Sequence, residues 1–430
     1  MALAPGPGRR KSMPGRANIA PSTSRRRARG VSSLWPLLAL TIVSPGCYLS
    51  HRLADDRDAG PRPADASPAD GAGLESSELP PRRLAVGGDG HVCFVRDDGR
   101  VACWGHNDHG QLGDGTTTDR TSPVDVIGLD DVVEVAVGVS HSCARRRDGS
   151  VACWGRNLWG EVGDGTRERR TEPRDLEGVR ATRIAAGYTS TFAIQVDGTV
   201  LAWGFNRFGQ LGDGTTLDRD LPVEVVGLRD VVSLATSLWH SCASRRNGTV
   251  ACWGDNEYAQ LGDGTTDPRW EPADVPGLDD VEQVTTGYGF SCVRRSEGRV
   301  WCWGWNESGQ LGDGTTAVGS TGPSLYRAEL SPTASFPSAT HIEASRPMAC
   351  AIDVDRSLWC WGMVTIPSVA VPRPVRIEGL GPVLEVGVGD WDICALQTDD
   401  QIRCWGINQW GAAGDGSTRN RATPVTVSGL

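Results

Sequence analysis

The stretches VACWGHNDHGQLGDGT, residues 101–116, and VACWGRNLWGEVGDGT, residues 151–166, are near copies of each other. Their Trp-Gly pair recurs down to the end of the chain. The tryptophans of these pairs are residues 104, 154, 203, 253, 303, 361 and 405. A period of about 50 residues is typical of propellers and solenoids. The sequence therefore predicts seven structural repeats, and a phrase present in nearly every repeat is expected to be a folding unit, not an active site.

Each repeat contains the signals of several short strands. The second copy runs through VVEVAVG (132–138), HSCARRR (141–147), Asp148-Gly149 and SVACWG (150–155). Alternating β-branched residues around Asp-Gly indicate two strands joined by a tight hairpin, here a three-residue turn with a left-handed glycine. A further short segment, such as PVDVIGL at 123–129, brings each copy to three or four strands, the content of a propeller blade. The 55 glycines and 26 prolines agree with an all-β chain rich in turns.

The phrases WGxNxxGQLGDGT, x-His-Ser-Cys and Asp-Gly-x-Val resemble the regulator of chromosome condensation repeat family. Members of that family form seven-bladed β-propellers, so the resemblance implies this fold for residues 82–430. An insertion at 317–349 and the missing Gly-Asp-Gly loop after the sixth Trp-Gly pair predict an irregular sixth blade. We also expect the terminal segment PVTVSGL, 424–430, to complete the sheet of the first blade and cover its edge.

The first 46 residues form a separate leader with eight basic and no acidic residues, followed by the apolar stretch VSSLWPLLALTIV at 31–43. This order is typical of a secretory signal, and the apolar stretch is short for a membrane span. Ser-Pro-Gly-Cys at 44–47 resembles the bacterial lipoprotein cleavage box, in which the cysteine is acylated. We predict an exported protein anchored to the membrane through Cys47, with plain secretion as the alternative. The length of the basic leader is also consistent with translation from Met13.

Residues 47–81 are rich in Asp, Ala, Pro, Ser and Gly and contain few large apolar side chains. Such a segment cannot bury enough surface to fold, so it is predicted to be a disordered tether. Removal of the leader changes the formal net charge from −10 to −18, because eight basic residues leave with it. Nucleic acid is therefore not an expected partner, since phosphate binding needs a basic surface.

The cysteines other than Cys47 form six pairs, each ten residues apart and symmetric about a hairpin turn. The pairs are Cys93 with Cys103, Cys143 with Cys153, Cys242 with Cys252, Cys292 with Cys302, Cys350 with Cys360, and Cys394 with Cys404. Opposed residues on antiparallel strands come close to disulfide reach. In the third copy Phe192 and Ala202 replace both cysteines together, as bonded partners would show. Zinc is the alternative, but one blade offers two sulfurs, with His91, His141 or His240 as a third ligand. We predict structural disulfides and no metal.

Candidate chemistry is sparse. The aspartate of Gly-Asp-Gly-Thr offers one carboxylate per blade, whereas calcium needs six or more oxygens, so a turn is predicted there. The repeated histidines are expected to hydrogen bond within their blades. In His106-Asn107-Asp108-His109 no third metal ligand is identifiable nearby. Phosphate-binding glycine loops, nucleophile elbows and zinc-protease motifs do not occur in the sequence. We predict neither an enzyme nor a cofactor.

Residues that vary between repeats are more informative about binding. The loop before each His-Ser-Cys strand and the residue after each Trp-Gly pair should emerge at the same end of the propeller. These positions hold Tyr188, Trp239, Tyr288, Trp391, Phe205, Trp305 and Arg156. Aromatic residues and arginine dominate binding hot spots, although plugging the channel or packing between blades is an equal alternative. By contrast, aromatic residues recur at one position before the GQLG-type segment and are predicted to pack between blades: Trp159, Phe208, Tyr258 and Trp410.

The opposite end should carry arginines beside the hairpin turns, at 145–147, 245–246 and 294–295. They are expected to form a solvated rim, with contact to anionic envelope polymers as the alternative. The sequence as a whole predicts a membrane-tethered propeller that presents one loop face to a protein or cell-envelope ligand. The resemblance implies two further candidates, guanine-nucleotide exchange on a small GTPase and inhibition of β-lactamases. A propeller lyase or hydrolase is the third alternative.

Overall fold

The structure is a computed structural model that describes residues 80–316, 326–334, 336–364 and 369–430. The predicted leader, Cys47 and residues 47–79 of the predicted tether lie outside these residues. Within the described ranges the chain contains strands and turns without a helix. None of these residues forms a helix that could cross a membrane.

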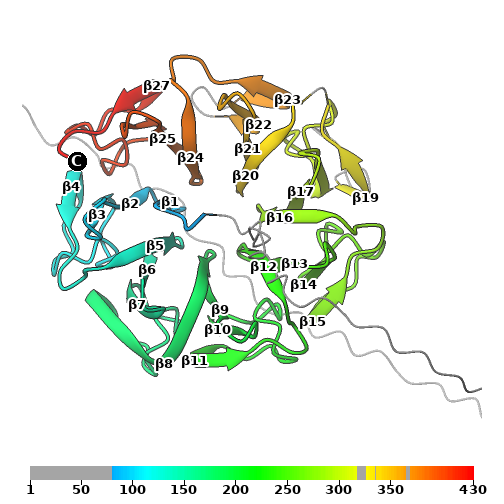
Figure 1. The fold of residues 1–430 in the computed structure, drawn as a ribbon, viewed down its shortest axis with the longest axis horizontal. Coiled ribbons are helices and arrows are strands. Elements are labelled where there is room, and N and C mark those ends of the chain that lie inside the picture. Colours follow the sequence, from blue (N-terminus) through cyan, green and yellow to red (C-terminus); the bar gives the residue numbers. More distant parts are fainter. Residues whose placement is uncertain (1–79, 317–325, 335, 365–368) are drawn as a thin grey trace, which may run out of the picture. The chain divides into compact units, whose positions relative to one another are not determined.

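The strands form seven four-stranded blades (Figure 1). Blade 1 contains β1 (Leu84–Val86), β2 (His91–Val95), β3 (Val101–Gly105) and β4 (Arg120–Asp125). Blade 2 contains β5 (Val132–Val137), β6 (His141–Arg146), β7 (Ser150–Gly155) and the first part of β8 (Arg170–Ala186). Blade 3 contains the second part of β8, β9 (Ser190–Gln195), β10 (Val200–Gly204) and β11 (Arg219–Glu224).

Blade 4 contains β12 (Val231–Thr236), β13 (His240–Arg245), β14 (Val250–Gly254) and β15 (Arg269–Asp274). Blade 5 contains β16 (Val281–Thr286), β17 (Phe290–Arg295), β18 (Val300–Trp305) and β19 (Tyr326–Pro332). Blade 6 contains β20 (Ala339–Ser345), β21 (Met348–Asp353), β22 (Leu358–Val364) and β23 (Val369–Arg376). Blade 7 contains β24 (Val383–Val388), β25 (Asp392–Gln397), β26 (Ile402–Gly406) and β27 (Arg421–Thr426).

The blades surround a central channel lined by their first strands (Figure 1). The long strand β8 pairs with β7 as the outer strand of blade 2 and with β9 as the inner strand of blade 3, so these two blades share one seven-stranded sheet. The predicted seven-bladed propeller is therefore confirmed. Blade 6 keeps four strands, and the insertion before it lengthens the connection that supplies β19 of blade 5.

The predicted closure of the ring is wrong. Strand β27 pairs with β26 inside its own blade, and β1 already fills the inner place of blade 1. Residues 84–125 supply all four strands of that blade, so no place is left for the C-terminal segment. The ring closes instead by side-chain contacts between blades 7 and 1. The indole Nε1 of Trp104 donates to the carbonyl oxygen of Ala412 at 2.9 Å, and the Glu385 carboxylate accepts the amides of Arg83 and Leu84.

The six cysteine pairs are joined by disulfides, as the sequence predicts, and zinc is not needed to explain them. The two cysteines of each pair are opposed on the middle hairpin of a blade, with Cα atoms 4.0–4.2 Å apart. The bonds join Cys93 to Cys103, Cys143 to Cys153, Cys242 to Cys252, Cys292 to Cys302, Cys350 to Cys360, and Cys394 to Cys404. Blades 1, 2, 4, 5, 6 and 7 therefore each contain one disulfide.

The hairpins themselves also have the predicted geometry. In blade 2 the turn covers residues 147–149, with Gly149 at a φ of 85°. In blade 3 the opposed residues are Phe192 and Ala202, and the Phe192 ring packs against Trp253 of the next blade at a centroid distance of 6.2 Å. An aromatic ring thus occupies the interior that a disulfide occupies elsewhere.

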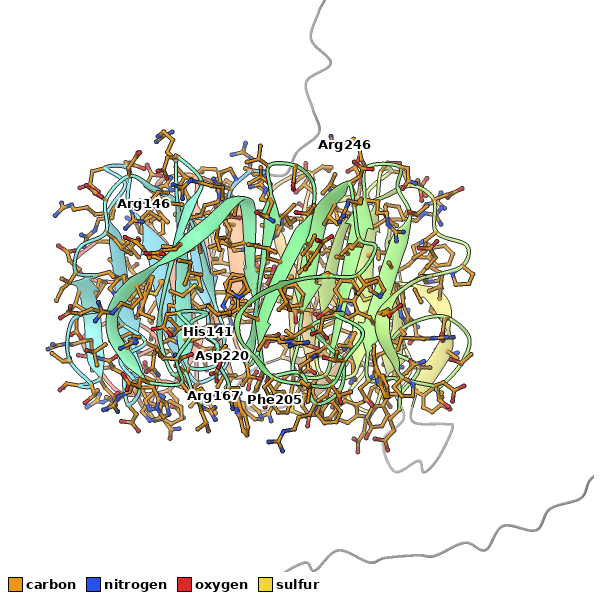
Figure 2. The ribbon with its side chains drawn as sticks, turned by 90° about the horizontal axis from the view of Figure 1, so that it is seen from below. His141, Arg146, Arg167, Phe205, Asp220 and Arg246 are labelled. Carbon is orange, nitrogen blue, oxygen red and sulfur yellow. A yellow bond between two sulfur atoms is a disulfide. The ribbon has the colours of Figure 1, made fainter. Side chains whose placement is uncertain are left out.

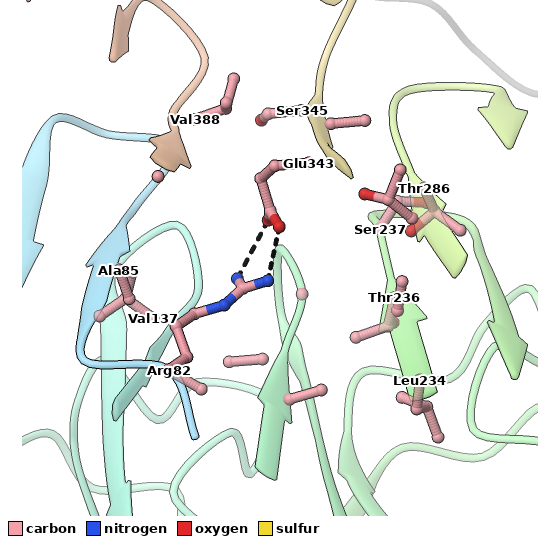
Figure 3. A pocket seen from close by; sticks show the side chains of 18 of the residues that line it. Arg82, Ala85, Val137, Leu234, Thr236, Ser237, Thr286, Glu343, Ser345 and Val388 are labelled. Carbon is pink, nitrogen blue, oxygen red and sulfur yellow. Dashed lines mark hydrogen bonds and ion pairs between the residues drawn. The ribbon is translucent and has the colours of Figure 1, made fainter. Parts of the chain in front are cut away.

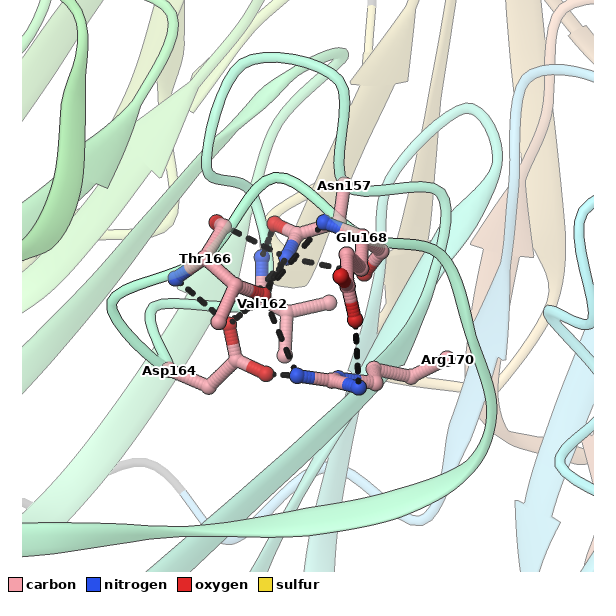
Figure 4. Close-up of polar contacts among 6 residues, drawn as sticks. All are labelled: Asn157, Val162, Asp164, Thr166, Glu168 and Arg170. Atoms are coloured by element: carbon pink, nitrogen blue, oxygen red, sulfur yellow. Dashed lines mark hydrogen bonds and ion pairs between the residues drawn. The ribbon is translucent and has the colours of Figure 1, made fainter.

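The repeated Gly-Asp-Gly-Thr segment closes a hydrogen-bonded loop in which the buried Asn157 is central (Figure 4). Its Nδ2 donates to the carbonyl oxygen of Thr166 at 3.0 Å, and its Oδ1 accepts the amide of Val162 at 2.9 Å. The Asp164 carboxylate accepts from the amide and hydroxyl of Thr166 and from Arg170 Nε at 2.6 Å. These contacts account for both Asn and Asp, so the repeated phrase is a structural unit.

A second set of hydrogen bonds joins neighbouring blades. His91 Nε2 lies 3.1 Å from Ser142 Oγ, which donates to the carbonyl oxygen of Gln111 at 2.9 Å. His240 and Ser291 repeat this arrangement between blades 4 and 5. Burial lowers the pKa of these histidines to about 3, so they are neutral near pH 7. The repeated histidines do form hydrogen bonds, but the expectation that these bonds stay within one blade is wrong, because the partners of Nε2 belong to the next blade.

Candidate binding face and central channel

The two ends of the propeller differ in the segments they expose (Figure 2). Arg146 and Arg246, beside the Asp-Gly or Asn-Gly hairpin turns, lie at one end, which we call the hairpin face. Phe205 lies at the other end with the Gly-Asp-Gly-Thr loops, which we call the loop face. The predicted separation of hairpin turns from variable loops is therefore borne out by the strand directions.

Seven aromatic side chains form a continuous row on the loop face, from blade 2 to blade 5. We call it the aromatic arc, and its members are Trp159, Phe205, Phe208, Trp239, Tyr258, Tyr288 and Trp305. Ring centroids of contacting members are 3.9–6.4 Å apart, the shortest distance being that between Trp239 and Tyr288. The structure thus brings together four of the predicted binding residues, Phe205, Trp239, Tyr288 and Trp305.

Three members of the arc are assigned by the sequence pattern only to packing between blades. Trp159, Phe208 and Tyr258 do contact neighbouring rings, but Phe208 is 38% exposed and lies between two loop residues of the face. Recurrence at one position therefore does not exclude a place on the surface. The fourth residue of that set, Trp410, stacks on His106 at 4.9 Å between blades 7 and 1.

Another predicted residue, Tyr188, belongs to a polar cluster at the mouth of the channel. Its hydroxyl donates to the carboxylate of Asp390, although the two residues belong to blades 3 and 7. Ser345 Oγ of blade 6 donates to Asp390 Oδ1 at 3.2 Å, and Arg346 Nε lies 3.4 Å from Asp390 Oδ2. Loops from three blades therefore meet over the channel. Burial raises the pKa of Asp390 to about 6.

Arg346 connects this cluster with the aromatic arc. Its guanidinium carbon lies 5.6 Å from the ring centroid of Tyr288 and 5.7 Å from that of Trp391. Trp391, another predicted residue, is 38% exposed. Arg156 lies apart from this group and pairs with the buried Glu161 at 3.8 Å. Sequence reasoning missed Arg346, because the loop of blade 6 lacks the His-Ser-Cys phrase that marks the corresponding loops elsewhere.

Behind this mouth the inner strands enclose a cavity of about 410 Å³ (Figure 3). Its wall has apolar side chains such as Val137 and Val388, and it carries hydroxyls along blades 4 to 6, as at Thr236. Blades 1, 2 and 7 also contribute the charged residues Arg82, Glu134 and Glu385 to the lining. The guanidinium of Arg82 crosses part of the channel and donates to both carboxylate oxygens of Glu343, at 3.0 and 2.5 Å.

Residues 77–366, two thirds of the chain, match the RCC1-like domain family. The chain belongs to this family. Solved RCC1-type structures agree with it in fold. The yeast RCC1 protein Prp20 bound to Kap60 is 18% identical with a TM-score of 0.67 over 78% of this chain and 85% of that one. Prp20p from Saccharomyces cerevisiae is 19% identical, with a TM-score of 0.66 over 79% and 88%. Human WBSCR16 is 18% identical, with a TM-score of 0.68 over 77% and 95%.

The arginines on the hairpin face of this RCC1-like propeller have acidic partners. Arg146 pairs with Asp175 and Arg245 with Asp274, each at 2.6 Å, and the exposed Arg147 lies 3.1 Å from Asp131. Exposed ion pairs of this kind contribute little to stability but lower the local excess of charge. For these arginines the pairing favours a solvated rim over a site for anionic polymers. Arg145 and Arg294 do not belong to a solvated rim as expected, because they are largely buried and pair with Glu134 and Glu282, each at 2.7 Å.

One cluster of the RCC1-like domain differs from the sequence-based expectation about metals. A third candidate ligand, Asp119, does accompany His106 and Asp108, and their ligand atoms lie within 4.8 Å of one another. Asp119 already accepts the amide of Asn107 at 2.8 Å, and both carboxylates are exposed. Three ligands are fewer than calcium requires and leave zinc one short of a closed structural site. The predictions of no metal and no enzyme stay predictions.

Proposed function

We propose that this RCC1-like propeller is a binding module that presents its loop face to a protein partner. The observation that carries the proposal is the aromatic arc, because seven partly exposed rings form one continuous row on loops of four blades. Aromatic clusters of this kind provide most of the binding energy at protein interfaces. Hairpin disulfides and hydrogen-bonded loops hold the row in place, which lowers the ordering cost of binding.

Relatives with the same fold are protein binders. Prp20 is bound to Kap60 in one structure, and the other was described with its binding properties toward Gsp1p and histones. Identities of 18–19% show a common fold and leave the partner of this chain open. Guanine-nucleotide exchange and β-lactamase inhibition are therefore alternatives to be checked by nucleotide release and by β-lactamase assays. A lyase or hydrolase activity is the further alternative.

We also propose that the protein is exported and tethered through a lipid on Cys47. Six buried disulfides support an oxidising compartment, since cytosolic reductants keep thiols reduced. The described chain enters the propeller on the hairpin side, where Arg83 Nη2 pairs with Asp97 of the first hairpin turn at 2.6 Å. Mass analysis of the membrane fraction would test for a diacylated Cys47.

Capture from envelope extract tests the binding proposal. The full chain should capture a partner that a variant with Trp239, Tyr288 and Trp305 changed to alanine fails to capture. Trp270→Ala is the matched control, because Trp270 is 51% exposed on β15 outside the arc. Near-ultraviolet circular dichroism would establish that all variants are folded. Equal capture by all three proteins would contradict a site on the arc, and no capture by any of them would favour the enzyme alternative.

A further inference from the structure

The side chain of Arg346 occupies a site on the loop face whose chemistry is specific for a guanidinium. We propose that this site receives an arginine side chain from a protein partner, which displaces Arg346. The inference deepens the proposed function and rests on it for the partner. Binding of a small arginine compound tests the site without the partner, so failure of this inference and failure of the proposed function are distinguishable.

The site combines two aromatic rings with one carboxylate. The guanidinium carbon of Arg346 lies 5.6 Å from the centroid of Tyr288 and 5.7 Å from that of Trp391, within the range of a cation–π contact. Its Nε lies 3.4 Å from Asp390 Oδ2. A planar guanidinium can stack on a ring while its N–H groups reach a carboxylate, whereas a lysine ammonium is a point charge without a stacking surface. The geometry therefore favours arginine over lysine.

Asp390 is held in place independently of Arg346. Its side chain is 3% exposed, and it accepts hydrogen bonds from the Tyr188 hydroxyl and from Ser345 Oγ. Asp89, from the loop between β1 and β2, and Asp392, next in blade 7, add carboxyl groups on the same side. A buried carboxylate is costly unless it is paired with a cation or well hydrogen bonded. The site is therefore preorganised for a positive charge.

Arg346 has the properties of a replaceable occupant. It lies with Pro347 in a two-residue turn, because Ser345 pairs with Met348 across β20 and β21. Its backbone φ is 25°, a value that residues other than glycine rarely adopt, so the backbone of this turn is strained. Its side chain is 34% exposed, which gives a partner access to the same rings.

The surroundings favour a basic partner. The chain has a formal net charge of −10, so a partner with exposed arginines is attracted over a distance. Tyr288 belongs both to the site and to the aromatic arc, where the centroid of its ring lies 3.9 Å from that of Trp239. A partner that covers the arc with apolar side chains can therefore insert an arginine at the end of the arc, over the channel mouth.

The experiment is a titration of the full chain with N-acetylarginine methylamide, followed by calorimetry, with the neutral citrulline analogue as control ligand. Arg346→Ala and Arg346→Met should bind the arginine compound at least about tenfold more tightly than the wild type, because the internal competitor is removed. Adding Asp390→Asn to Arg346→Ala should abolish that gain. The matched control is Arg147→Ala, which removes an ion-paired arginine on the hairpin face and should bind as the wild type does.

Equal affinity of the wild type and both Arg346 variants would overturn the inference, as would a citrulline affinity equal to that for arginine. Retained tight binding after Asp390→Asn would also overturn it. Arg346→Met keeps the aliphatic stem of the side chain, so it answers the question if the alanine variant is poorly folded. Loss of partner capture in the aromatic-arc variant, together with no arginine effect, would reject this site and leave the proposed binding face standing.

Discussion

Replacing Val92 by threonine should leave the propeller as stable as it is, or more stable, although Val92 is fully buried. Burying a hydroxyl in an apolar interior normally costs about 1–3 kcal/mol when it has no partner. The expectation comes from the hydrogen bonds between blades. At the seam between blades 2 and 3, Thr191 occupies the place of Val92, with its hydroxyl 2.9 Å from His141 Nε2 and donating to the Glu161 carbonyl oxygen at 2.9 Å.

The boundary between blades 7 and 1, which we call a seam like the other blade boundaries, lacks the hydrogen bond that His141 and Thr191 form between blades 2 and 3. Asp392 stands where the other blade has His141, and its Oδ2 finds no hydrogen-bond partner in the described part of the chain. The residue of blade 1 that faces Asp392 is Val92. Val92 pairs with Trp104 just as Ser142 of blade 2 pairs with Trp154, so the two residues hold the same position in their blades. Two other seams pair apolar residues, because Phe290 shares a cluster with Ala349 and Met348 shares one with Ile393. Among the described seams, only the one between blades 7 and 1 therefore places a polar residue, Asp392, against an apolar one, Val92.

The size of the expected change in the free energy of unfolding follows from the hydrogen bonds that the new hydroxyl can form. The new hydroxyl can donate to the Ala412 carbonyl oxygen, which already accepts Trp104 Nε1, and can contact the orphaned Asp392 carboxyl group. Two such hydrogen bonds contribute about 1 kcal/mol each. They offset the cost of burying the hydroxyl, so the free energy of unfolding of Val92→Thr should change by between about 0 and +1 kcal/mol. One methyl group of the valine remains, which preserves most of the packing.

Urea unfolding without reductant, followed by tryptophan fluorescence, would measure this change. The matched control is Val101→Thr, because Val101 is equally buried on β3 in an apolar cluster. It should lose about 1–3 kcal/mol, since its hydroxyl replaces a methyl group among Leu129 and Val132. Equal losses in the two variants would refute the argument that the seam contains an unfilled hydrogen-bond site.

Three further outcomes are expected. Changing Cys143 and Cys153 together to alanine should lower the free energy of unfolding by about 2–3 kcal/mol, because the bond closes a loop with a sequence separation of 10; an unchanged urea midpoint would contradict this. Because burial raises the pKa of Asp390 from 3.8 to about 6, its contribution to stability is full below pH 4 and is lost as the pH rises through 6. Between pH 4 and pH 7 this group should lower the free energy of unfolding of the wild type by up to about 3 kcal/mol, and Asp390→Asn should lack that decrease when both proteins are unfolded with urea at the two pH values. An equal decrease in the two proteins would count against the prediction. Asn157→Ala should cost about 2–3 kcal/mol and speed hydrogen exchange in its loop, since it leaves buried partners unsatisfied; unchanged exchange would show that the loop does not depend on the amide.

The sequence by itself determined the blades. Strand order, the Asp-Gly turn and the cysteine spacing all lie within about ten residues of one another, so local rules of hairpin geometry fix which residues are opposed. Phe192 and Ala202, opposed in blade 3, follow the same rule. Local rules also predicted which loops reach the same end of the propeller, and hence the common face of Phe205, Trp239 and Tyr288.

Only the tertiary structure decided how the ring closes and which loops meet. Whether the last strand joins the first or the last blade depends on which place in blade 1 is empty, and β1 fills it. Tyr188 and Asp390 are separated by 202 residues and touch because their blades lie across the channel from each other. Arg346 joins them from a loop without a recognisable motif. A repeating pattern specifies each unit and its neighbour, but contacts across the channel depend on the number of blades and on side chains that the repeat leaves free to vary.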